Sequence, residues 1–145
     1  MFSLINNLFT SKPEYIETVE NCMAAIKHDG KALEHIDDQS VEMCLAAVES
    51  DGMNLRYVMN QTPEICMAAI KSDPWALVYV NEQTHDMCME AVKHCGLLLK
   101  FVKTPTPEIC QEAYKQNKRA KRYIDEKMCI VSDISDDQTS VHSDE

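Results

Sequence analysis

Cysteines are the residues with the clearest capacity for chemistry, and five of them recur every 22 residues. They are Cys22, Cys44, Cys66, Cys88 and Cys110. A zinc or redox site would need clustered thiols, such as two cysteines with about two to four residues between them. Neighbouring helical layers stack roughly 8–10 Å apart, whereas the Cα atoms of a disulfide lie within about 7 Å. We therefore interpret this cysteine column as small, buried, reduced packing residues, and we expect no metal and no cofactor.

Other ionisable residues also lack a catalytic arrangement. The histidines His28, His35, His85, His94 and His142 have no serine or cysteine nearby in a triad-like context. An acid stands two residues before each cysteine, at Glu20, Glu42, Glu64, Asp86 and Glu108. These acids fit the first turn of a helix, where the helix dipole favours negative charge. The sequence therefore predicts a protein that is not an enzyme.

The 22-residue period extends well beyond the cysteines. A hydroxyl residue lies four positions before each of them: Thr18, Ser40, Thr62, Thr84 and Thr106. An alanine lies three positions after: Ala25, Ala47, Ala69, Ala91 and Ala113. A ring lies thirteen positions after (His35, Tyr57, Tyr79, Phe101, Tyr123), followed by a β-branched residue (Ile36, Val58, Val80, Val102, Ile124). Such a period indicates stacked supersecondary units.

One repeat shows how each unit is built. Thr62 is a suitable N-cap and Pro63 a suitable first residue for a helix that runs to about Ser72. Asp73 and Pro74 then signal a second, shorter helix. Asp-Gly replaces Asp-Pro at 29–30 and 51–52, where glycine would suit a left-handed helix end. The sequence thus predicts an all-α fold, a short right-handed α-solenoid of five 22-residue helix hairpins.

The repeated columns have expected packing roles. We expect the alanines to mark the close approach of the two helices within a hairpin, where a larger residue would overpack the structure. We expect the ring column, His35 included, and the β-branched column to fill the interfaces between adjacent hairpins. The ends divide the chain into an apolar N-terminal cap at 1–16, the array at 17–126, and an acidic tail at 127–145 that we expect to be disordered.

The best-defined unit resembles a known repeat family. Its first helix reads QTPEICMAAI at 61–70, and its second reads WALVYV at 75–80. This pattern is similar to a repeat abundant in giant DNA viruses of amoebae and catalogued as domain of unknown function 4116. The resemblance covers about 110 of the 145 residues. It implies an all-helical array and a viral source, and it carries over no catalytic or ligand-binding residue.

Function is expected to reside in a binding surface. Solenoids bind through equivalent positions of successive repeats, and one variable stripe lies nine residues after each cysteine: Lys31, Met53, Trp75, Leu97 and Arg119. Its Trp75 is either an exposed interface anchor or a residue buried between hairpins. The predicted function is that of a protein-interaction scaffold or adaptor with a host or viral protein partner. The oligomeric state is left open.

A basic segment supports an alternative function. Five cations fall within eight residues, at Lys115, Lys118, Arg119, Lys121 and Arg122. This basic patch matches a short nuclear-localisation or phosphate-binding pattern, or it is a solvated face on the capping repeat. The net charge of −10 disfavours general nucleic-acid binding. No signal peptide or membrane span is recognised, so we expect an intracellular protein of the host cytoplasm, with the nucleus or the virion as alternatives.

Overall fold

The computed structural model describes residues 18–126, and the regular elements in that range are all helical. The α-helices are α1 (Val19–His28), α2 (Val41–Ser50), α3 (Pro63–Ser72), α4 (His85–His94), α5 (Pro107–Gln116) and α6 (Lys121–Glu126). The 3-10 helices are η2 (Gly30–His35), η3 (Gly52–Tyr57), η4 (Pro74–Tyr79), η5 (Gly96–Phe101) and η6 (Lys118–Ala120). The N-terminal cap and the acidic tail expected from the sequence lie outside the described residues.

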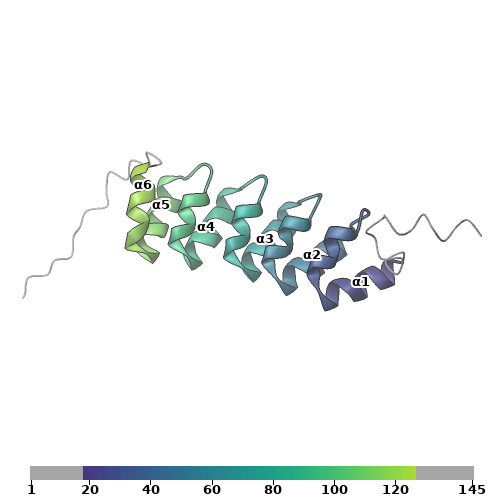
Figure 1. Ribbon diagram of the computed structural model, residues 1–145. Helices are drawn as coiled ribbons and strands as arrows, with labels where there is room; N and C mark the ends of the chain where they lie inside the picture. The colour runs from purple at the N-terminus through teal and green to yellow at the C-terminus, as the bar shows by residue number, and fades with distance from the viewer. Residues whose placement is uncertain (1–17, 127–145) are drawn as a thin grey trace, which may run out of the picture.

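The elements form two layers along one array (Figure 1). Each of the helices α1 to α4 contacts the α-helix of the next repeat, and successive 3-10 helices contact each other. The α-helices of the middle repeats also contact the 3-10 helix of their own repeat and that of the preceding one. The predicted all-α repeat fold is confirmed, and the shorter second helix of each of the first four repeats is a six-residue 3-10 helix.

Capping side chains start both kinds of helix where the sequence places them. Thr62 Oγ1 accepts a hydrogen bond from the backbone N–H of Ile65 at 3.3 Å. The hydroxyls of Thr18, Ser40, Thr84 and Thr106 accept in the same way. Asp73 Oδ1 then accepts from the backbone N–H of Trp75 at 2.9 Å and begins η4. Each cap satisfies an amide that the first helical turn would otherwise leave without a partner.

The 3-10 geometry decides which side chains of the second layer are buried. Residues three apart eclipse each other on a 3-10 helix, so Gly52, Leu55 and Val58 face the same way and are all buried. The whole β-branched column is buried, as predicted for the interfaces between repeats.

The ring column packs against the core at Tyr57, Tyr79, Phe101 and Tyr123, but less completely than predicted. His35 is exposed, and Tyr57, Tyr79 and Phe101 are half-buried, with only Tyr123 buried. The ring precedes the β-branched residue by one position, so it lies off the line of residues that faces the α-helices. Most of this column therefore lies partly on the surface of the 3-10 layer.

The glycines have a different role from the predicted one. Gly52 has no left-handed backbone, and the preceding Asp51 is extended, with φ −157°. A Cβ on Gly52 would meet the carbonyl oxygen of Ala69 and lie 2.7 Å from the backbone nitrogen of Asp73. Ala69 belongs to the next repeat. This close approach is therefore between two successive hairpins. The sequence had predicted a close approach at the alanine column within a single hairpin.

Candidate binding surface

The periodic cysteines are all buried, as predicted. The thiols of Cys44, Cys66 and Cys88 lie 3.8, 3.6 and 3.7 Å from glutamine side-chain oxygens, within reach of weak S–H···O hydrogen bonds. Burial raises the pKa of each of these three thiols above its ordinary value. A protonated, inaccessible thiol is a poor nucleophile. We therefore interpret these three cysteines as packing residues of the core.

The glutamines that meet those thiols form a column that the sequence analysis missed. Gln39, Gln61 and Gln83 stand five residues before their cysteines. Gln83 Nε2 donates to the carbonyls of Leu77 and Phe101, at 3.3 and 3.1 Å, and its Oε1 accepts from the N–H of Lys103 at 2.9 Å. The side chain thus ties together the ends of two successive 3-10 helices. Recurrence at 22 residues was the available signal, and Pro105 breaks it in the fifth repeat.

Other polar groups do not converge into a site. The described residues contain no group of three or more His, Cys, Asp or Glu side chains that could hold a metal ion. His94 Nε2 lies 3.5 Å from Glu90 Oε1 at the exposed end of α4. Each member of the acid column lies in the first turn of its α-helix, as expected. None of the helices in the described range is long and apolar enough to cross a membrane.

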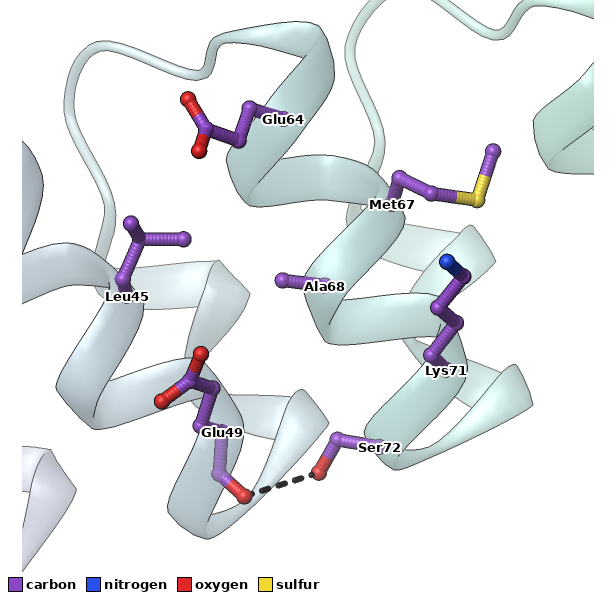
Figure 2. A pocket seen from close by; sticks show the side chains of 7 residues that line it. All are labelled: Leu45, Glu49, Glu64, Met67, Ala68, Lys71 and Ser72. Atoms are coloured by element: carbon purple, nitrogen blue, oxygen red, sulfur yellow. Dashed lines mark hydrogen bonds between the residues drawn. The ribbon is translucent and has the colours of Figure 1, made fainter.

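An open groove of about 570 Å³ lies between α2 and α3. Figure 2 shows Ala68 facing the gap between the two helices, with Glu64 extending from α3 towards α2. Ser72 Oγ donates to the carbonyl of Glu49 at 3.4 Å and links the two helices. The remaining lining comes from Leu45, Met67 and Lys71. Among these lining residues no nucleophile is hydrogen-bonded to a side-chain base.

The predicted stripe lies on the 3-10 layer. Each of its members is the second residue of its 3-10 helix. In four repeats its backbone N–H donates at 2.9 Å to the side chain of the capping Asp or Asn. Lys31, Trp75 and Arg119 are exposed, whereas Met53 and Leu97 are half-buried. In these four repeats the cap that starts the 3-10 helix therefore also fixes the position of the stripe residue, whereas η5 begins at Cys95 without a side-chain cap.

Trp75 is exposed, which excludes burial between hairpins, and its role as an interface anchor stays a prediction. It is 46% exposed, and its neighbour Val78 on η4 is 42% exposed. The indole packs edge-to-face on Phe101 of the next repeat, with ring centroids 6.0 Å apart. This contact orients the indole while a large part of it stays in solvent.

The predicted basic patch is exposed and spans α5, η6 and α6. Two of its cations lie over aromatic rings: the Lys118 ammonium is 4.3 Å from the Tyr114 centroid, and the Arg122 guanidinium is 4.5 Å from that of Tyr123. Lys115 lies 3.7 Å from a carboxylate oxygen of Glu112. The patch is therefore a continuous cationic end of the array whose charges are partly engaged within the chain.

Comparison with known proteins finds one family model that matches part of this chain. The family model described as "Domain of unknown function (DUF4116)" matches residues 40–84 and again residues 62–105. Each match spans about two hairpins, and the two matches are offset by one repeat, so they overlap. Searches among curated proteins and among solved structures find no match to this chain.

Proposed function

We propose that the chain is a non-enzymatic protein-binding module that presents its 3-10 layer to a protein partner across several repeats. The observation that carries this proposal is Trp75, an exposed tryptophan at the centre of the stripe. Tryptophan is enriched among the residues that dominate interface energies. Repeat arrays gain contact area by addition, so affinity is spread over several hairpins. Such a scaffold or adaptor would have a host or viral protein as its partner, given the viral source that the resemblance implies.

Affinity capture with a double variant tests this function. Trp75→Ala combined with Arg119→Glu removes the anchor and reverses a charge at the end of the stripe. We expect loss of captured partner, with helicity and melting close to those of the unchanged protein, because both side chains are exposed. Lys71→Glu on the α-helical side is the matched control. Turnover of a substrate by the purified protein, or capture that needs only residues 127–145, would contradict the proposal.

The basic patch favours one alternative, a nucleic-acid-binding or nuclear-targeted protein. Its five exposed cations are the supporting observation. Binding through phosphates would weaken steeply with added salt, because neutralised phosphates release their counterions. A protein interface centred on Trp75 would depend less on salt. Titrations at two salt concentrations therefore separate the two functions.

A further inference from the structure

Charge is divided between the two layers of the array. The 3-10 helices carry Lys31, Arg56, Lys100, Lys118 and Arg119 against the single carboxylate of Glu34. The first five α-helices carry twice as many carboxylates as lysines. The acids are Glu20, Glu42, Glu49, Glu64, Asp86, Glu90, Glu108 and Glu112, and the lysines are Lys27, Lys71, Lys93 and Lys115. The capping carboxylates of Asp29, Asp51 and Asp73 stand just before three of these helices and accept hydrogen bonds from their first turns. The excess of cations therefore belongs to the 3-10 helices themselves, in a chain of net charge −10.

Two cations flank the exposed apolar centre in a regular way. Arg56, Val78 and Lys100 occupy the same position of three successive repeats, twelve residues after the cysteine. All three are exposed. Trp75 lies on the same helix as Val78. The middle of the 3-10 layer therefore presents an apolar spot with a positive charge one repeat away on either side.

Both cations are oriented by aromatic rings of the ring column. The Arg56 guanidinium lies 4.7 Å from the Tyr57 centroid, and the Lys100 ammonium lies 5.5 Å from the Phe101 centroid. Cation–π contact restrains these long side chains and reduces the entropy lost when they meet an anion. The half-buried position of the rings, which the packing prediction failed to anticipate, is what allows this arrangement.

We propose that this surface, defined by Arg56, Trp75, Val78 and Lys100, binds an acidic segment of a partner protein. The inference rests on the proposed protein-binding function and specifies its partner class. An apolar side chain of the segment would contact Trp75 and Val78, and carboxylates on either side would meet Arg56 and Lys100. Layer spacing of roughly 8–10 Å puts the two cations roughly 16–20 Å apart across two repeats. An extended chain spans that distance in about five or six residues, which sets the separation of the carboxylates.

A protein segment fits this surface better than a nucleic acid does. Binding of single strands relies on aromatic faces on which bases can stack. Here the chain's own Arg56 lies over the Tyr57 ring and its own Lys100 over the Phe101 ring, while Trp75 packs edge-to-face on Phe101. The acidic α-helical layer would also repel a polyanion that extends past the surface. Carboxylates spaced along a short segment avoid both obstacles.

Fluorescence offers a direct test, because Trp75 is the only tryptophan in the chain. The probe is a tryptophan-free peptide with a central leucine and two glutamate pairs six residues apart. The control peptide has lysine in place of every glutamate, and an oligothymidylate tests nucleic acid. We expect a saturable change in Trp75 emission with the glutamate peptide only. Added salt should weaken this binding, but less steeply than it would weaken binding to phosphates, because only two cations take part.

Charge-reversed variants locate the binding. The double variant Arg56→Glu with Lys100→Glu should lower the affinity for the glutamate peptide by roughly tenfold or more. The control, Lys71→Glu with Lys93→Glu on the α-helical layer, should change that affinity by less than about twofold. Should the first pair fail to fold, Arg56→Gln with Lys100→Gln removes the charges without reversing them. Circular dichroism checks the fold of each variant.

Several outcomes would overturn the inference. These are equal binding by both variant pairs, tighter binding of the oligothymidylate through Arg56 and Lys100, or self-association of the peptide-free protein through the same two residues. If the glutamate peptide does not bind but a partner is still captured through Trp75, only the acidic character of the partner segment is overturned. Failure of both peptide binding and partner capture would overturn the protein-binding function as well.

Discussion

The two sides of the 3-10 layer differ in how far residue types recur from one repeat to the next. The side that faces the α-helices keeps one residue type through four repeats, with Leu33, Leu55, Leu77 and Leu99 all fully buried; Lys121 takes this position in the fifth repeat. The outer side repeats only in position, and one of its columns reads Glu34, Arg56, Val78, Lys100 and Arg122. Close packing fixes the inner side, because buried positions tolerate little change in volume. The outer side carries no such constraint, so recognition can be encoded there without altering the array.

The largest expected effect comes from two adjacent residues of η4. Leu77 is fully buried, whereas Val78 is 42% exposed. Leu77→Ala should lower the free energy of unfolding by about 2–5 kcal/mol through the cavity it leaves. Val78→Ala should change it by less than about 0.5 kcal/mol. Urea unfolding of both variants measures the difference, and similar losses would mean that the two sides of the layer are not distinct.

A smaller effect is expected at the glutamine column. Gln61 Nε2 donates to the carbonyl of Tyr79 at 2.9 Å, and its Oε1 accepts from the N–H of Asn81 at 3.0 Å. Gln61→Ala leaves the Tyr79 carbonyl and the Asn81 N–H without this side-chain partner. It should lower the free energy of unfolding by about 1–3 kcal/mol. Asn60→Ala, at the exposed residue just before it, is the control and should be nearly neutral. Equal effects in thermal melts would show that the glutamines do not tie the repeats together.

The smallest effect is a pH dependence from the buried thiols. Burial raises the pKa of Cys44, Cys66 and Cys88 in the folded protein. The folded state therefore holds these protons more tightly than the unfolded state. Stability should be unaffected by these thiols below about pH 8.5, the ordinary thiol pKa, and should fall as pH rises towards the folded-state values. Urea titrations at several pH values measure the fall, and Cys66→Ala should reduce it. A fall of the same size in Cys66→Ala would assign it to other groups.

What the sequence could predict followed from local chemistry. The hydroxyl caps, the helix from Pro63 to Ser72 and the buried cysteines each depend on residue type within one repeat. The role of Gly52 could not be predicted, because it depends on the Ala69 carbonyl of the next hairpin. The exposure of the ring column was missed because six residues are too few to distinguish an α-helix from a 3-10 helix. The charge division emerged only once the two layers were assigned.

The central claim is that the outer side of the 3-10 layer binds a protein partner. Amide chemical-shift mapping with the glutamate peptide tests it most directly, because every repeat reports separately. We predict that the largest shifts fall on η3, η4 and η5, with the Trp75 indole N–H among them, and that α2, α3 and α4 change little. Shifts concentrated around the groove between α2 and α3, or at residues 115–122 alone, would contradict the account.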